Sequence, residues 1–156
     1  MLIQEMTRGD SLSLLKSMRL GRLACAKDAQ PYITPFYFSF AGNYLYSFST
    51  VGQRIDWMRE NPLVCVETDE VMSSQEWVSI IIFGSYQELT DTAEWERERA
   101  IAHELLQHHP DWWEPGYVKT TIDGRDRPLD PVYFRIEITE TTGHRATANG
   151  GGDQLG

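Results

Sequence analysis

Cysteine is scarce in this sequence, and its two cysteines, Cys25 and Cys65, each lie inside a strand-like apolar run. Neither has another cysteine or a cluster of histidines beside it, so the sequence predicts buried free thiols and no disulfide framework. The four histidines also lack the spacing of a zinc site. We therefore expect no metal centre.

Basic residues and long apolar runs are scarce as well. Lysine and arginine total 14 against 23 aspartates and glutamates, which gives a formal net charge of −9 and a pI near 4.8. Nucleic acid and anionic membrane surfaces repel such a chain, so neither is an expected partner. No apolar run approaches the roughly 20 residues of a membrane span, and no basic segment followed by an apolar core opens the chain. We expect a cytoplasmic protein.

The length of 156 residues is typical of one domain with a single hydrophobic core. We predict one domain over residues 1–145. The glycine-rich stretch that follows cannot bury apolar surface, so residues 146–156 are predicted to be a disordered tail.

Two runs near residue 40 are dense in β-branched and aromatic side chains: Pro31–Phe40 and Tyr44–Ser49. The residues between them tolerate a positive φ angle, so the two runs predict a β-hairpin. Alternation along the second run places its aromatic side chains on one face: Tyr44, Tyr46 and Phe48.

A helix is predicted directly after the second run. Thr50, followed three residues later by Gln53, has the form of a capping box, and apolar residues then follow at helical spacing. Free N–H groups in the first turn, the hydroxyls of Ser49 and Thr50 and the guanidinium of Arg54 are the components of a phosphate site. A capped surface helix with an exposed arginine explains the same pattern, and spacing alone leaves both readings open.

Several later segments also have clear patterns. Trp77–Gly84 is apolar on both alternating faces, which predicts a strand covered on both sides, by a second subunit or by a helix of the same chain. The polar stretch Asp69–Glu76 before it predicts a loop, Thr90–Gln107 predicts an amphipathic helix, and Pro131–Thr139 predicts a final strand. Residues 109–131 are predicted to be loop-rich.

Apolar surface exceeds what one small barrel needs for its core. The two-faced strand, the aromatic face of Tyr44–Ser49 and the apolar face of the helix after Thr90 all need cover. We therefore predict a homodimer. Trp112 and Trp113 are large apolar residues in a polar context, and they either anchor their loop or form a lid over a cleft.

The order of these segments resembles the flavin mononucleotide (FMN)-binding split β-barrel family of pyridoxamine 5′-phosphate oxidase-like proteins, in particular its nitroimidazole-resistance-like flavoproteins. The matching segments are Gly21–Ala24, Pro31–Pro35, Tyr44–Ser49, Gly52–Arg54, Asn61–Val66 and Trp77–Gly84, with a weaker match over Ile138–Arg145. The resemblance implies a mainly β fold with flanking helices (α+β), built as a split β-barrel of about six antiparallel strands.

The resemblance also implies a flavin between the two chains of a homodimer. Transferred residue by residue, it assigns phosphate contacts to Ser49, Thr50 and Arg54, and ring contacts to Ile33, Thr34 and Pro35.

Three further positions follow from the resemblance. Gln53 is uncharged where the family often has a basic residue, which weakens the expected phosphate affinity. Trp77 lies either at the mouth of the flavin cleft or in the core at the barrel rim. Arg145, displaced by an inserted histidine, is a weaker candidate for a second basic contact.

No residue stands out as an acid, a base or a nucleophile, so the catalytic residues stay unknown. A flavin carries electrons on its own ring system, and an enzyme of this kind needs no such residue. The leading hypothesis is an FMN-dependent oxidoreductase that passes electrons from NADH or NADPH to a small aromatic, quinone or nitro acceptor. The alternative is a non-catalytic flavin- or heme-binding carrier or sensor. The sequence does not decide between them, or between FMN and heme or a deazaflavin.

Overall fold

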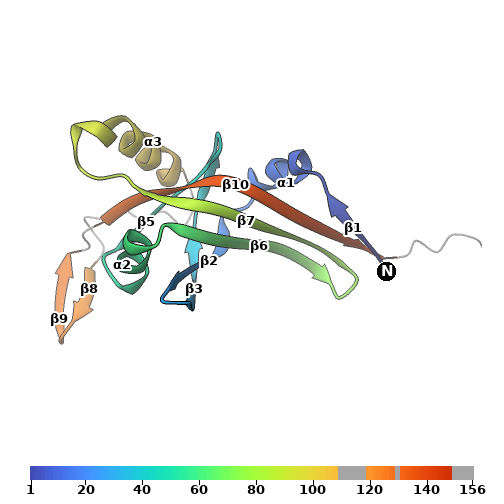
Figure 1. Ribbon diagram of the computed structural model, residues 1–156, viewed down its shortest axis with the longest axis horizontal. Coiled ribbons are helices and arrows are strands. Elements are labelled where there is room, and N and C mark those ends of the chain that lie inside the picture. Colours follow the sequence, from blue (N-terminus) through green and yellow to red (C-terminus); the bar gives the residue numbers. More distant parts are fainter. Residues whose placement is uncertain (109–118, 129–130, 149–156) are drawn as a thin grey trace, which may run out of the picture.

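The structure, a computed structural model, describes residues 1–108, 119–128 and 131–148 (Figure 1). Its strands are β1 (Leu2–Met6), β2 (Leu20–Lys27), β3 (Gln30–Tyr37), β4 (Ser39–Ala41), β5 (Tyr44–Thr50), β6 (Leu63–Ser73), β7 (Glu76–Glu88), β8 (Lys119–Ile122), β9 (Arg125–Pro128) and β10 (Pro131–Thr147). Its helices are α1 (Arg8–Leu15), α2 (Gln53–Glu60) and α3 (Glu96–Gln107), with a 3-10 turn, η1 (Ala93–Trp95), before α3.

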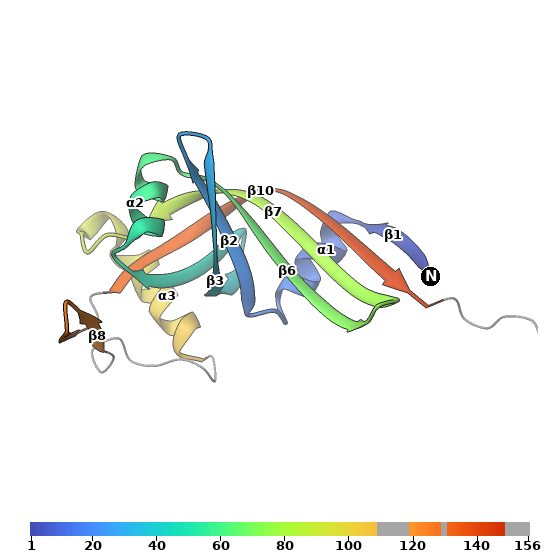
Figure 2. The same ribbon diagram turned by 90° about the horizontal axis from the view of Figure 1, so that it is seen from below.

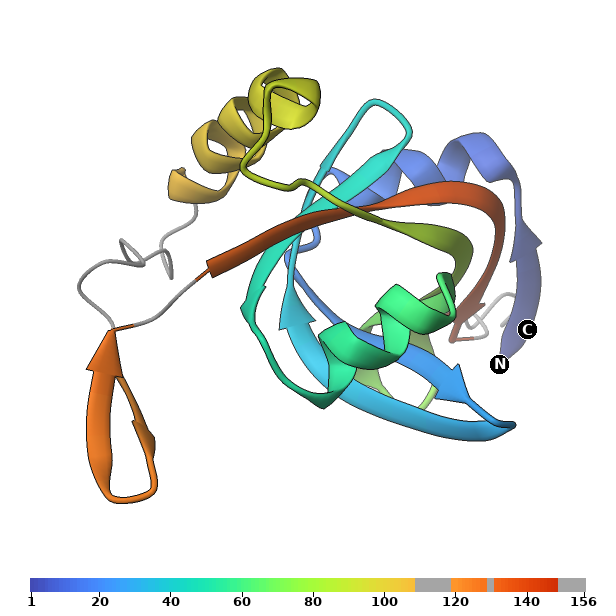
Figure 3. The ribbon, with the colours of Figure 1, turned by 60° about the vertical axis from the view of Figure 1, so that its left-hand side comes forward.

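Eight of the strands form one antiparallel sheet in the order β3-β2-β6-β7-β10-β5-β4, with β1 paired to β10, while β8 and β9 form a separate hairpin. The sheet curls round its core, and α2 lies across one end of the curl (Figure 3). The strands β3 and β4 follow one another in the chain but lie at opposite edges of the sheet, so the barrel is split between them. The predicted mainly β, α+β split-barrel fold is confirmed, with eight strands in place of about six.

The hairpin predicted from residues 31–49 is only partly right. β4 pairs with β5, but β3 pairs along its whole length with β2. The chain leaves the first ladder at Phe38, whose side chain is fully buried, and then joins the opposite edge of the sheet. One continuous β-rich run therefore serves both edges, and its composition cannot reveal where it changes partner.

Two strands run further than their polar composition predicted. The stretch Asp69–Glu76 is not a loop, because β6 continues to Ser73 and forms a long hairpin with β7 (Figure 2). Likewise β10 continues past the predicted end at Thr139 to Thr147, paired with β7 and β1. Residues 146 and 147, which were predicted to be part of the tail, belong to this strand. An exposed sheet face accepts polar side chains, which is why these segments resembled loops.

The main core lies inside the curled sheet and contains the inward-facing residues of each long strand. In β7, Val78, Ile80 and Ile82 are buried, and the intervening side chains face outward. Helix α1 packs on β10 beside Gly143, where a Cβ atom would lie 2.5 Å from the Oγ of Ser11. Glycine is needed there because any larger residue would collide with the helix.

A second apolar cluster lies between α3 and the outer face of β5 and β10. Ala102 and Leu106 of α3 pack against Tyr46 and Tyr133, with Leu89 between them. The predicted aromatic face of β5 and the predicted apolar face of this helix therefore cover each other within one chain. These two surfaces are therefore no longer arguments for a homodimer. Of the three apolar surfaces on which that prediction rested, the outer face of β7 remains.

The structure tests the predicted buried thiols in full and the predicted loop at residues 109–131 only in part. Both cysteines are free, with Cys25 buried and Cys65 half-buried on the outer face of the sheet. Within residues 109–131, predicted as loop, β8 and β9 form a hairpin. Trp112, Trp113 and residues 149–156 lie outside the described residues. No helix in the described ranges is long and apolar enough to cross a membrane.

The turn between β2 and β3 predicts a stabilising substitution. Both of its central residues have positive φ angles, 49° at Asp28 and 63° at Ala29, as in a type I′ turn, where the second position favours glycine. Ala29→Gly should therefore raise the free energy of unfolding by about 0.5–1 kcal/mol in urea denaturation. The matched control, Ala24→Gly within β2, should lower it by about the same amount. A destabilised Ala29→Gly protein would contradict the positive φ at this turn.

Candidate functional site

Helix α2 is attached to the barrel by Ile55 and Met58, which are both fully buried. It begins at Gln53 with Gly52 as its N-cap, so the capping box predicted at Thr50 is wrong. Thr50 is still part of β5, where it pairs with Pro131 of β10, and that ladder keeps it out of the helix. No side chain among the described residues caps the helix, which leaves the N–H groups of its first turn available to a ligand.

Arg54 joins three separate segments of the chain. Its Nη1 donates to Thr34 Oγ1 at 2.9 Å and to the carbonyl oxygen of Pro35 at 3.2 Å, and its Nη2 donates to Ser49 Oγ at 2.9 Å. Thr34 and Pro35 lie on β3 and Ser49 lies on β5, two strands that do not pair with each other. Arg54 therefore bridges the split in the barrel. The sequence had assigned all four of these residues to one site, and the structure brings them together.

The charge of Arg54 has no counterpart in the described part of the chain. The side chain is half-buried, and none of the ion pairs found among the described residues includes it. Burial lowers the pKa of the Arg54 guanidinium, yet arginine stays charged at physiological pH. A desolvated cation without an anion is unfavourable, so this position favours a negatively charged ligand.

Arg54 also has donors left for such a ligand. A guanidinium has five N–H donors, and the three hydrogen bonds above leave the Nε–H and one hydrogen on Nη2. These two donors and the open N–H groups of the first turn of α2 suit a phosphate group. The donor set therefore fits the phosphate of a nucleotide cofactor.

The other predicted site residues are placed less closely. Gln53 is exposed on the first turn of α2, and Thr50 accepts a hydrogen bond at its carbonyl oxygen from Ser49 Oγ at 3.2 Å. Ile33 is 63% exposed on the outward side of β3, two residues from Pro35. These three residues lie near Arg54 in the fold, but none of them forms a hydrogen bond with it among the described residues.

Trp77 and Arg145 lie far from Arg54 within one chain. Trp77 is near the start of β7, whereas Glu88 at the other end of that strand contacts α2. Roughly 35 Å of strand therefore separates Trp77 from α2. Trp77 and Arg145 instead line a shallow pocket on the long β6–β7 hairpin together with Met72. Figure 1 shows this hairpin and α2 at opposite ends of the sheet. In a single chain, Trp77 is not at the mouth of the cleft beside Arg54.

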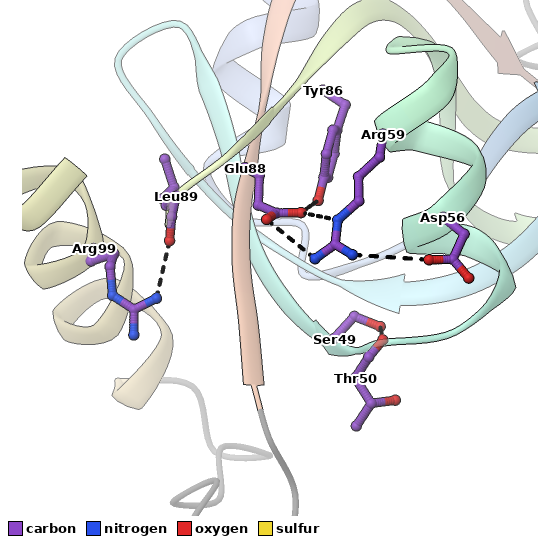
Figure 4. A network of polar contacts seen from close by, with 8 residues as sticks. All are labelled: Ser49, Thr50, Asp56, Arg59, Tyr86, Glu88, Leu89 and Arg99. Carbon is purple, nitrogen blue, oxygen red and sulfur yellow. Dashed lines mark hydrogen bonds and ion pairs between the residues drawn. The ribbon is translucent and has the colours of Figure 1, made fainter. Parts of the chain in front are cut away.

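A second polar network next to the site was not predicted (Figure 4). Arg59 of α2 donates from Nε and Nη2 to the two carboxylate oxygens of Glu88, at 2.7 and 3.2 Å, and the hydroxyl of Tyr86 donates to Glu88 at 2.8 Å. Burial opposes ionisation of Glu88, but the hydrogen bonds from Arg59 and Tyr86 outweigh it and lower its pKa. Arg59 and Glu88 are 29 residues apart, and each looks like an ordinary surface charge in the sequence.

The two ionisable groups near Arg54 that could act as nucleophiles, Cys25 and Tyr86, are both held in their protonated form. Burial raises the pKa of the nearby Cys25 thiol, with the charge of Arg54 opposing the shift, so the thiol stays protonated. Burial likewise raises the pKa of the Tyr86 hydroxyl, and its hydrogen bond to Glu88 raises it further. The donors around Arg54 therefore suit an anionic group, and neither Cys25 nor Tyr86 is activated as a nucleophile.

Comparison with known proteins identifies relatives of this arrangement. The sequence profile of the pyridoxamine 5′-phosphate oxidase family matches residues 7–145. An uncharacterized protein of Rhizobium meliloti is 40% identical over 148 residues, which cover 95% of this chain and 98% of that protein. The crystal structure of an FAD-binding protein from Mesorhizobium loti has a TM-score of 0.78 and 38% identity, covering 94% of this chain and all of that one.

A more distant structure shares the fold alone. It is a candidate 5-nitroimidazole antibiotic resistance protein from Bacteroides thetaiotaomicron, with a TM-score of 0.64 and 15% identity, covering 93% of this chain and 89% of that one. The profile match spans most of the sequence, and the Rhizobium relative agrees along nearly its whole length. The chain belongs to the pyridoxamine 5′-phosphate oxidase family.

Proposed function

We propose that this protein is an FMN-dependent oxidoreductase that passes electrons from a nicotinamide donor to a small aromatic, quinone or nitro acceptor. The observation that carries the proposal is the half-buried cation of Arg54 at the split of the barrel, which has no ion-pair partner among the described residues and has donors left over for a phosphate. The FAD-binding relative from Mesorhizobium loti supports a flavin as the bound molecule. A cytoplasmic location stays a prediction.

The residues of the chain would hold the flavin and orient it. Arg54, Ser49 and the first turn of α2 would bind the phosphate, and the backbone from Ile33 to Pro35 would face the ring edge. When bound, the flavin supplies the electron transfer on its own ring system. No proton-transferring side chain is needed in this assignment, in agreement with the raised pKa of the Cys25 thiol and of Tyr86.

FAD is the second candidate, and one feature of the site favours it. Among the described residues assigned to the phosphate position, Arg54 is the single cation, because Gln53 is uncharged. FAD carries a similar total charge but spreads it over two phosphoryl groups with one charge each, so one cation balances the group next to it, whereas the FMN phosphomonoester concentrates about −1.5 to −2 on one group. A Cβ atom at Gly52 would meet no atom within 4 Å, so the approach to the phosphate position is open.

The homodimer is also a proposal, supported by the outer face of the sheet. Ile33, Ala24, Cys65 and Phe83 are neighbours in one apolar row across β3, β2, β6 and β7. Phe83 is 44% exposed, and α3 contacts β5 and β10. A second copy would cover this row, and because Ile33 belongs to it, the flavin ring would lie between the two chains.

The absorbance spectrum of the purified protein tests the cofactor assignment. We expect flavin maxima near about 370 and 450 nm, and chromatography of the released cofactor separates FMN from FAD. A Soret band would favour the heme alternative. A colourless protein that also fails to bind added FMN and FAD would contradict the proposal.

Turnover then separates the enzyme from a carrier. With reduced nicotinamide and a quinone or nitro acceptor, an enzyme should bleach and recover its flavin absorbance through repeated cycles. Slow bleaching without recovery would favour the carrier or sensor alternative.

A further inference from the structure

The segment that leads into α2 has little packing of its own. Val51 and Gly52 are exposed, and a Cβ atom at Gly52 would meet no atom of the described residues within 4 Å. The buried side chains of Ile55 and Met58 attach α2 to the core, but apolar contacts are not directional and leave its rotation weakly defined. Directional contacts therefore define the orientation of α2: the hydrogen bonds of Arg54 to β3 and β5 at its start, and a polar contact of its last turn at the other end.

The two-pronged ion pair of Arg59 with Glu88 is such a contact (Figure 4). Its two parallel hydrogen bonds, at 2.7 and 3.2 Å, connect the last turn of α2 to the end of β7. Paired bonds of this kind restrict the angle between the two groups as well as their distance. The Glu88 side chain is only 22% exposed, so water competes weakly for it.

The ion pair is attached to the core of the barrel through Tyr86. The hydroxyl of Tyr86 donates to Glu88 Oε1 at 2.8 Å, and its buried ring lies 5.4 Å from that of Phe134. Glu88 is therefore held from both sides, by a helix residue and by a core residue. A further ion pair, Lys27 with Glu60, also joins α2 to the sheet, but its carboxylate side chain is 60% exposed against 22% for Glu88, so it contributes less to the placement of the helix.

We propose that Glu88 is a positioning residue: through Arg59 it fixes the orientation of α2 and thereby holds the Arg54 guanidinium at the phosphate position. Glu88 itself would not touch the flavin. The inference rests on the proposed function, because it assigns Glu88 a role only toward a phosphate bound at Arg54.

The test compares ligands with and without a phosphate. Glu88→Gln keeps the size of the side chain and an acceptor oxygen but removes the charge. The apoprotein of this variant should bind FMN about tenfold more weakly than wild type in a fluorescence-quenching titration. Its affinity for riboflavin, which has no phosphate, should be unchanged, because the ring contacts lie on β3. A purely structural defect would weaken both ligands alike.

Matched variants control for charge and for folding. Glu60→Gln removes a carboxylate from the same helix and should change neither affinity. Arg59→Lys should keep more FMN affinity than Arg59→Gln, because lysine retains the charge facing Glu88. If Glu88→Gln does not fold, Tyr86→Phe removes only the hydroxyl that holds Glu88, and a smaller loss of FMN affinity is expected with riboflavin binding intact.

The outcomes separate the positioning role of Glu88 from the phosphate site at Arg54. Unchanged FMN affinity in Glu88→Gln, or an equal loss for FMN and riboflavin, would overturn the positioning role and leave the proposed function standing. A wild-type protein that binds riboflavin as tightly as FMN and FAD would refute the phosphate site at Arg54 itself.

Discussion

Arg54→Ala is expected to weaken FMN binding by about 10- to 150-fold, or about 1.5–3 kcal/mol, the contribution of a charge-assisted hydrogen-bonding partner. The loss follows from the position of Arg54, which faces both edges of the split and has no carboxylate partner among the described residues. Isothermal titration of the apoprotein with FMN measures it. Unchanged affinity would show that the phosphate binds elsewhere.

The same substitution should have little effect on the apoprotein. It removes three hydrogen bonds that join α2 to β3 and β5, which lowers stability. It also removes a half-buried charge without an anion, which raises stability. The two effects oppose each other, so the free energy of unfolding without flavin should change by less than about 1 kcal/mol. Urea denaturation of the two apoproteins checks this balance.

Two companion variants separate charge from geometry. Arg54→Lys keeps the charge but has no planar fork, so it cannot bridge Thr34 and Ser49, and we expect it to recover only part of the affinity. Ser49→Ala should cost about 0.5–1.5 kcal/mol in FMN affinity, because a neutral hydroxyl makes a weaker bond than a guanidinium. Full recovery in Arg54→Lys would mean that charge alone determines the affinity.

The residues proposed to bind the phosphate are close in the sequence. Ser49, Gln53 and Arg54 lie within six residues, where a strand ends and a helix begins, and this local pattern suggested a phosphate site but also fitted a capped surface helix. The contact of Arg54 with Thr34 joins residues 20 apart, and only the resemblance to a family linked them beforehand. The local pattern therefore singled out Arg54 as a candidate, and the family resemblance supplied its remote partner.

The errors have a common physical cause. Which edge of the sheet β3 joins, where β6 and β10 end and what covers the aromatic face of β5 all depend on long-range pairing. Polar residues on an exposed strand look like a loop, and an apolar face looks the same whether a helix or a second chain covers it. The Arg59–Glu88 pair was missed for the same reason, because exposed charges 29 residues apart have no local signature.

The outer face of β7 differs from the aromatic face of β5 because no helix of the described chain packs on it. Ile81 is half-buried on this face, between the fully buried Ile80 and Ile82 that point into the core. Its neighbour across β6 is Glu67, whose pKa is raised by burial and by a hydrogen bond with Asp69. Arg22 of β2 lies on the other side of Glu67, so acidic and basic residues are adjacent on this face. Two copies related by a two-fold axis could match these opposite charges.

Ile81→Asp is therefore expected to abolish the dimer and the bound flavin together. A carboxylate there would be buried in the interface without a partner and would face Glu67, and both effects oppose association. Light scattering should give a mass of twice 17.9 kDa for the wild type and a monomer or aggregate for the variant. The interface of such an obligate dimer is expected to bury more than about 2,000 Å² in total. Ile81→Val should stay dimeric and keep its flavin, and so should Leu2→Asp, which adds a charge at an exposed position on β1. Because Ile33 belongs both to the apolar row of this face and to the ring contacts, loss of the interface should release the flavin even though Arg54 is intact. A wild-type monomer with one flavin per chain would contradict the shared site and leave Arg54 to bind the cofactor within a single chain.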